Sequence, residues 1–158
     1  MRYVKGSVAL SSSRDIPLLL HLRNSRFVTH RQLFDLMHIE ASEYSRRSFN
    51  WRVQRLLASN YMSVCDGNFG CGEKVYRITR GGLLQLEKYG HFAAVLNSRT
   101  QHLPHVSQAH HALELKAVQI ALTHANVLTT WQSDVETTSF NTISIMPLNK
   151  DYDTLVDV

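Results

Sequence analysis

Apolar and polar positions recur with the period of a helix over the first sixty residues of the chain. The spacing predicts short amphipathic helices near 14–24, 30–37 and 42–59. Ser13, Thr29 and Ser42 stand at the starts of these segments, and serine and threonine commonly cap a helix N-terminus. The pattern therefore predicts three helices joined by short turns.

The next segment has the pattern of two β-strands. Residues 61–65 and 74–78 are rich in β-branched and aromatic types, and the turn residues of 66–72 separate them. This pattern predicts a β-hairpin. Thr79 follows, and we expect it to cap a further helix that runs through 81–87.

The remainder of the chain predicts one long helix and three strands. Residues 90–105 show little periodicity and read as a connection, whereas 107–125 predicts a helix with apolar residues on two faces, which we expect to be covered on both sides. Strands are expected at 127–131, 140–146 and 152–158. An αβββ segment of this size forms a marginal core alone, so we expect it to be completed by dimerisation or to belong to a longer protein.

A heptad seam runs along the predicted helix at 107–125. Its members alternate four and three residues apart: Val106, His110, Leu113, Ala117, Ile120 and His124. The seam favours packing of this helix, with His110 and His124 buried against a neighbour, and it allows a homodimer through the helix.

Charge divides the chain into two parts. Residues 1–100 carry 15 Lys and Arg against 7 Asp and Glu, whereas residues 101–158 carry 2 against 6. A basic segment of this kind suits a polyanion, because neutralising phosphates releases counterions. The net charge of +4 conceals this division.

The predicted helix at 42–59 has one apolar face and one cationic, aromatic face. Rotation of about 100° per residue places Phe49, Val53, Leu56 and Leu57 together. It places Tyr44, Arg47, Ser48, Trp51 and Arg55 on the opposite face. Arg46 turns toward the apolar face, so a phosphate contact or an internal ion pair suits it better than base readout. Trp51 is expected to cover the hairpin, to meet a second subunit or to contact DNA.

The order of helices and strands over 14–89 resembles the winged helix-turn-helix family of DNA-binding domains. The residues that carry the resemblance are 27–29 before the second helix, 53–57 at the end of the third, and 76–82 after the hairpin. The resemblance implies an α+β fold in which three helices and a β-hairpin wing precede the small αβββ segment. The implied domains are an arm at 1–13, a winged helix at 14–90, a connection at 91–106 and the segment at 107–158.

The resemblance also implies a DNA interface. The third helix enters the major groove and the wing grips phosphate. The expected DNA-binding residues are Tyr44, Arg46, Arg47, Ser48, Trp51, Arg52, Arg55, Lys74 and Arg77.

A second resemblance extends over both parts of the chain. A basic winged helix, then His110-His111, Trp131–Asp134 and Asp151–Leu155, is similar to the replication-relaxation family of plasmid and mobile-element proteins, whose second domain is restriction-endonuclease-like. The chain departs from that pattern, because Tyr152-Asp153 stands where a Pro-Asp pair is common and no Glu-x-Lys follows. Only Asp153, Asp157 and Glu114 fit a Mg²⁺ site, so we predict no nuclease activity.

Other chemistries lack their motifs. His102, His105, His110 and His111 have no accompanying cysteine pair or HExxH helix, so we expect no metal and no cofactor. No nucleophile motif or phosphate-binding loop is present, so no catalytic residue is predicted. The cysteines are expected to be reduced, and no apolar run is long enough for a membrane span, which favours a cytoplasmic protein without a membrane partner.

The sequence thus predicts a double-stranded DNA-binding protein in transcriptional regulation or in plasmid replication and mobilisation. Two alternatives stay open. In the first alternative, the winged helix is a protein-docking module anchored by Trp51. In the second, the chain is an accessory fragment of a restriction-endonuclease-like protein.

Overall fold

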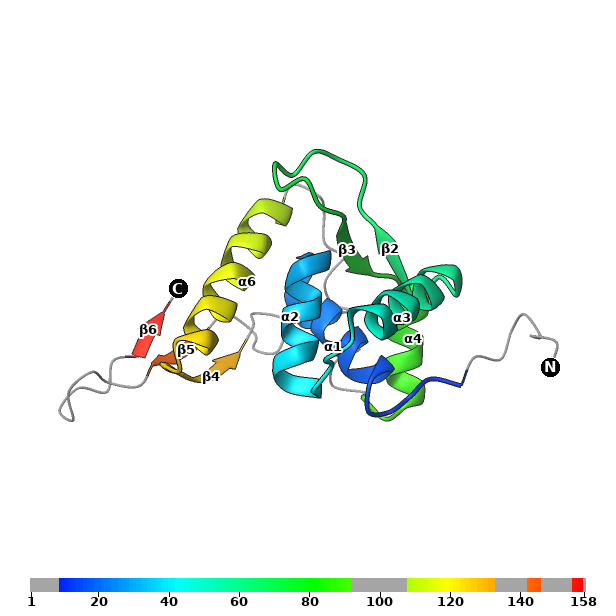
Figure 1. Cartoon of the computed structure of the whole chain (residues 1–158), viewed down its shortest axis with the longest axis horizontal. Helices are drawn as coiled ribbons and strands as arrows, with labels where there is room; N and C mark the ends of the chain where they lie inside the picture. Colours follow the sequence, from blue (N-terminus) through cyan, green and yellow to red (C-terminus); the bar gives the residue numbers. More distant parts are fainter. Residues whose placement is uncertain (1–8, 92–107, 133–141, 146–154, 158) are drawn as a thin grey trace.

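The computed structural model describes residues 9–91, 108–132, 142–145 and 155–157 (Figure 1). The fold is α+β, as predicted. Its helices are α1 (Asp15–Ser25), α2 (His30–Ala41), α3 (Arg46–Ala58), α4 (Arg80–Lys88) and α6 (Ala109–His124). Its strands are β1 (Val28–Thr29), β2 (Met62–Val64), β3 (Val75–Ile78), β4 (Leu128–Gln132), β5 (Thr142–Ile145) and β6 (Leu155–Asp157). The first eight residues of the predicted arm, and the predicted connection from residue 92, lie outside the described residues.

Helix starts follow the predicted capping chemistry at two of four positions. The Thr29 side chain accepts a hydrogen bond from the Gln32 amide, the Gln32 side chain returns one to the Thr29 amide, and Thr79 caps α4 by accepting from Gly82. Ser13 is not a cap, because the turn before α1 is closed by the Asp15 carboxylate, which accepts from the Ser11 amide at 2.7 Å.

The predicted start of the third helix at Ser42 is also wrong. α2 continues to Ala41 and ends at Ser42, which has φ of 52° and donates its amide to the Met37 carbonyl. Ser45 caps α3 instead, since its side chain accepts from the Ser48 amide. The longer α2 therefore takes residues that sequence periodicity assigned to a connection.

The described strands form two antiparallel sheets. In the first, β3 lies between β1 and β2, and Met62 pairs with Ile78, which confirms the predicted hairpin. In the second, β5 lies between β4 and β6, which confirms the three strands expected near the end of the chain.

The main core lies between α1, α2, α3 and the first sheet. The fully buried side chains include Leu18, Leu22, Leu33, Met37, Phe49, Val53, Leu56 and Tyr76. The apolar face predicted for α3 is therefore confirmed, with Leu57 partly buried at its edge.

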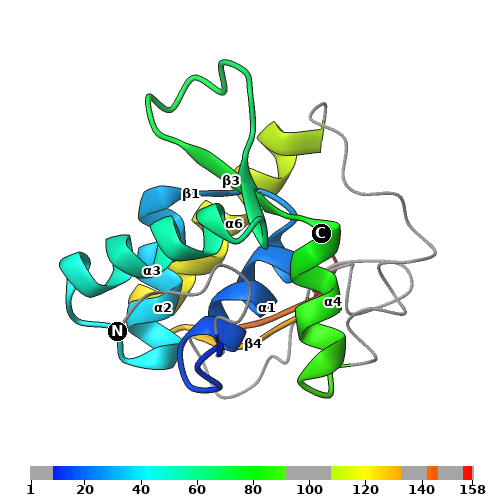
Figure 2. The same cartoon turned by 90° about the vertical axis from the view of Figure 1, so that its right-hand side faces the viewer.

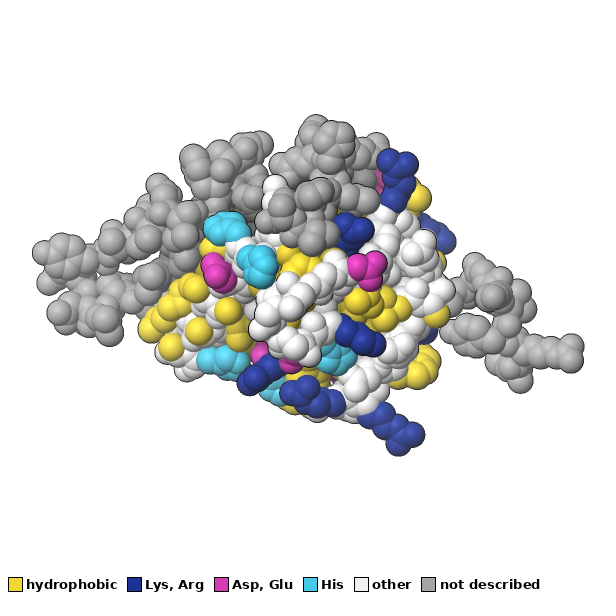
Figure 3. All heavy atoms as spheres, turned by 90° about the horizontal axis from the view of Figure 1, so that it is seen from above, with side chains coloured by type: hydrophobic (Ala, Val, Ile, Leu, Met, Phe, Trp, Pro, Cys, Tyr) yellow, Lys and Arg dark blue, Asp and Glu magenta, His cyan; other side chains and the backbone are white. Residues whose placement is uncertain are grey.

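α6 covers the side of α2 away from α3, as Figure 1 shows, and lies behind these helices in the turned view of Figure 2. It buries Ala109, Ala112 and Leu113 against Phe27 and Val75, and Ile120 joins the main core. We expected neighbours to cover both apolar faces of this helix, and within the described residues that prediction is wrong, because Val118 is 46% exposed. Apolar side chains are visible over the helix in Figure 3. His110 and His124 are exposed as well.

A buried ionic network joins α1 to α3. Asp15 has no solvent exposure; Arg52 Nη1 lies 2.8 Å from its Oδ1, and Arg55 pairs with its Oδ2. Glu43, 3% exposed in the loop before α3, pairs with Arg52 at 3.5 Å and with Arg14 at 3.2 Å. Burial alone raises the pKa of Asp15, but hydrogen bonds from Arg55, the Ser11 amide and Arg52 outweigh it and hold the pKa below its usual 3.8.

We expect Asp15→Ala to lower the free energy of unfolding by about 3–5 kcal/mol, because it leaves two guanidinium groups without their buried partner. Urea denaturation monitored by circular dichroism measures the change. Asp66→Asn, at an exposed turn residue, serves as the control and should change stability by less than about 0.5 kcal/mol. Equal stabilities of the two variants would contradict the structural role of Asp15.

His21 gives the fold a separate dependence on pH. It lies on α1 with its side chain 12% exposed, 3.3 Å from the Glu40 carboxylate. Burial, and secondarily the charge of Lys116, lower the pKa of His21 from 6.5 to about 4. The folded protein therefore keeps His21 neutral at a pH where the unfolded chain is already protonated.

Stability should fall as the pH decreases from 6.5 to 4, because the unfolded state then binds more protons than the folded state. The loss through His21 reaches about 3 kcal/mol. Urea midpoints measured across this range should fall for the wild type and stay nearly level for His21→Gln. A parallel decline in both proteins would show that other groups cause it.

Candidate nucleic-acid interface

The outer face of α3 and the residues before it form an exposed aromatic and cationic surface. Tyr44 is 74% exposed and Trp51 60% exposed. Arg46, Arg47 and Ser48 are also exposed. Five of the nine predicted DNA-binding residues therefore lie together on this surface, which we call the α3 surface.

Arg46 forms a cation–π contact and, among the described residues, no ion pair. Its guanidinium group lies over the Phe34 ring, 4.3 Å from the centroid. Phe34 also stacks on His38, and His38 meets Tyr44 edge-to-face at 5.0 Å. This row of rings holds the Arg46 charge at the surface near the start of α3.

Arg55 and Arg52 are turned away from the α3 surface, so the prediction that Arg55 faces outward is wrong. Their side chains are 15% and 12% exposed, and both are bound to Asp15. A buried carboxylate requires charged partners, and α1 lies beside this flank of α3. Arg55 also lies 5.0 Å from the Trp51 ring centroid, so it supports that exposed indole from one side.

Arg77 lies on the other face of the first sheet. Side chains alternate along a strand, and Tyr76 and Ile78 enter the core that contains Phe49, whereas Val75 packs with Ala109 of α6. Arg77 shares the face of Val75 and is only partly exposed. It is therefore not part of the α3 surface.

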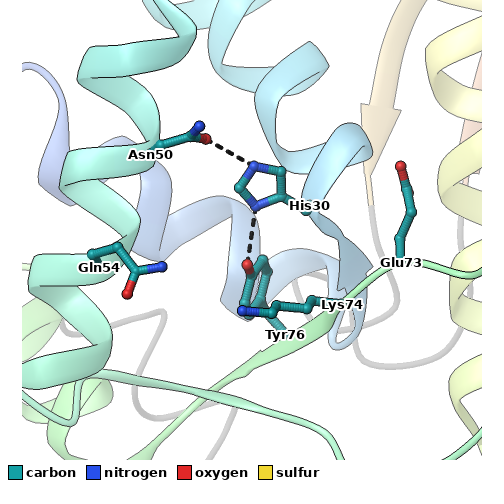
Figure 4. Close-up of a pocket in the computed structure, with 6 residues that line it drawn as sticks. All are labelled: His30, Asn50, Gln54, Glu73, Lys74 and Tyr76. Atoms are coloured by element: carbon teal, nitrogen blue, oxygen red, sulfur yellow. Dashed lines mark hydrogen bonds between the residues drawn. The ribbon is translucent and has the colours of Figure 1, made fainter.

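A pocket of about 370 Å³ lies between α3, the start of α2 and the hairpin (Figure 4). Its lining consists of His30, Asn50, Gln54, Glu73, Lys74 and Tyr76. Lys74 is the one predicted residue in this lining. Asn50 and Gln54 are exposed, and they stand one turn apart on α3, beside the α3 surface.

A chain of hydrogen bonds crosses the pocket. The Tyr76 hydroxyl lies 2.9 Å from His30 Nδ1, and His30 Nε2 lies 2.9 Å from Asn50 Oδ1. The His30 ring also meets the Phe49 ring edge-to-face at 5.1 Å, and its amide donates to the Lys74 carbonyl at 3.0 Å. Tyr76 and Phe49 of the core thereby hold the His30 ring, and through it the Asn50 amide, in place at the surface.

Sequence reasoning missed His30, Asn50 and Gln54. The signal available was helical spacing, because Arg47, Asn50 and Gln54 recur at intervals of three and four residues and so lie along one flank of a helix. Nothing local showed that this flank would face the hairpin, or that the opposite flank would face α1.

The described residues contain no group of three or more His, Cys, Asp or Glu side chains placed to hold a metal ion. Glu114 is exposed on α6, Asp153 lies outside the described residues, and Cys65 and Cys71 are free thiols. Within the described part of the chain, no helix is long and apolar enough to cross a membrane.

No protein-family model, curated protein or solved structure matches this chain.

The two arginines of α3 should differ in their effect on stability. Arg55→Ala is expected to lower the free energy of unfolding by more than about 2 kcal/mol, because Asp15 stays buried with one charged partner fewer. Arg47→Ala should change it by less than about 0.5 kcal/mol. Urea denaturation of the two variants under one buffer condition measures the difference, and similar values would contradict this division of roles.

Proposed function

We propose that this protein binds double-stranded DNA as a winged helix, with α3 in the major groove and the hairpin against the phosphate backbone. The observation that carries the proposal is the continuity of the α3 surface with the pocket. Arg47, Ser48, Asn50 and Gln54 present charged and hydrogen-bonding groups outward from one helix, and Lys74 lies across the pocket from it. A helix fits the major groove, and these residue types bond to base edges and phosphates.

The distribution of charge supports the same proposal. Arg14, Arg52 and Arg55 neutralise the buried Asp15 and Glu43, so their charge stabilises the fold and is not available to DNA. Arg46 and Arg47 remain at the α3 surface, and Lys74 extends the positive charge to the hairpin. Glu73 lies beside Lys74 and reduces its field, so Arg47 should be the stronger phosphate contact.

Protein docking is the second candidate function, favoured by the exposure of Trp51 and Tyr44. Aromatic side chains of this size anchor many protein interfaces. DNA binding is the better proposal because arginines flank these rings, and sugars, thymine methyl groups and phosphates match such a surface. The resemblance to winged helix and replication-relaxation proteins supports a role in transcription or in plasmid replication, which footprinting on DNA from the protein's own locus would test.

Binding to a random duplex at low salt should be detectable by fluorescence anisotropy and should weaken steeply with added salt. Arg47→Ala and Lys74→Ala are each expected to reduce the slope of log affinity against log salt by about 0.9, which corresponds to one lost phosphate contact. Lys88→Ala, at an exposed cation in the last turn of α4, is the matched control and should leave the slope unchanged.

No binding by the wild type at low salt would reject the proposal and leave protein docking. Binding with equal slopes for all three variants would place the DNA on another surface.

A further inference from the structure

The hydrogen-bond chain at the pocket restricts what Asn50 can recognise. We infer that Asn50 reads a base through its amide nitrogen alone, and that it therefore selects guanine over adenine at the base it contacts. This inference rests on the proposed function, since it names the base preference of the same surface.

The direction of the hydrogen bonds follows from the burial of Tyr76. Tyr76 is 1% exposed although it lines the pocket, so we infer that its hydroxyl proton is donated to an acceptor within the protein. The acceptor that the described residues provide is His30 Nδ1, at 2.9 Å. A neutral imidazole has one donor and one acceptor nitrogen, so the proton of His30 is on Nε2.

The orientation of the Asn50 amide follows from this tautomer. His30 Nε2–H donates to Asn50 Oδ1 at 2.9 Å, so the amide oxygen is directed at the protein. Figure 4 shows the Asn50 nitrogen on the side away from the His30 ring. The reverse orientation would require His30 to donate from Nδ1, which would leave the buried Tyr76 hydroxyl without its acceptor.

The His30 ring cannot easily move to release Asn50. It packs edge-to-face against Phe49 of α3, it is hydrogen-bonded to Tyr76 of β3, and it belongs to the first residue of α2, after the Thr29 cap. Three separate elements, α2, β3 and α3, therefore meet at this ring. The donor at the surface is fixed before any ligand arrives.

A fixed donor has a defined preference in the major groove. An asparagine that reads adenine accepts from N6 and donates to N7, which requires its oxygen. Guanine presents two acceptors there, O6 and N7, and two amide hydrogens satisfy them. Asn50 is therefore matched to guanine. The side chain of Gln54, one turn later, makes no hydrogen bond to the described residues, so the Gln54 amide can adopt either orientation.

The test is selection of binding sites from a random duplex pool with the intact chain. The wild type should select guanine at one position, and Asn50→Ala should lose the preference at that position alone. His30→Phe keeps a ring in place but frees the amide, so guanine should lose about tenfold in affinity relative to adenine at that position. Gln54→Ala is the matched control and should leave this position unchanged.

The outcomes separate the inference from the proposed function. Failure of the wild type to enrich any duplex would reject DNA binding itself. Enrichment with adenine at the Asn50-dependent position, or with the same guanine preference in His30→Phe, would overturn the inference and leave DNA binding intact.

The tautomer of His30 can be measured without DNA and without a variant. Two-bond nitrogen–proton correlation spectra of the ¹⁵N-labelled protein at neutral pH should show the proton of this ring on Nε2. A proton on Nδ1 would overturn the inference whatever the selection result.

Discussion

The arrangement of this protein depends on one buried carboxylate. Asp15 lies at the start of α1 with no solvent exposure, and both guanidinium groups bound to it come from α3. An ionised side chain in that position is stable only when charged partners compensate its lost hydration. Since Arg52 and Arg55 lie on one flank of α3, their attachment fixes the rotation of that helix about its axis. The opposite flank, with Asn50 and Gln54, is thereby turned toward the hairpin.

This constraint separates two groups of cations around α3. Arg14, Arg52 and Arg55 compensate buried acids and stabilise the packing of α1 against α3. Arg46, Arg47 and Lys74 stay at the surface, where charge is free to act on a partner. A count of basic residues therefore overstates the charge available for DNA, because these three arginines are paired with buried carboxylates. The exposed rings of Tyr44 and Trp51 lie among the second group, and Arg55 of the first group contacts the Trp51 ring.

The pocket shows how an interior can determine the chemistry of a surface. Tyr76 belongs to the core, yet its hydroxyl group reaches His30, and His30 reaches Asn50 at the edge of α3. In the inferred tautomer of His30, the Tyr76 hydroxyl donates to Nδ1 and Nε2–H donates to the Asn50 oxygen, which can only accept. The cap at Thr29 sets the position of His30, so a local feature of α2 contributes to the orientation of a side chain on another helix.

Local patterns in the chain suffice for the element types, the caps at Thr29 and Thr79, the hairpin, and the apolar face of α3. These features depend on residues close in sequence, whose spacing repeats with the period of a helix or strand. Local patterns do not decide what lies against each flank of α3, because Asp15 is 37 residues from Arg52 and 40 from Arg55. For the same reason they did not place Arg77 on the α6 side of β3, or His30 beside Asn50. Helical periodicity separates buried from exposed positions, whereas the partner of each polar side chain is decided by packing between distant segments.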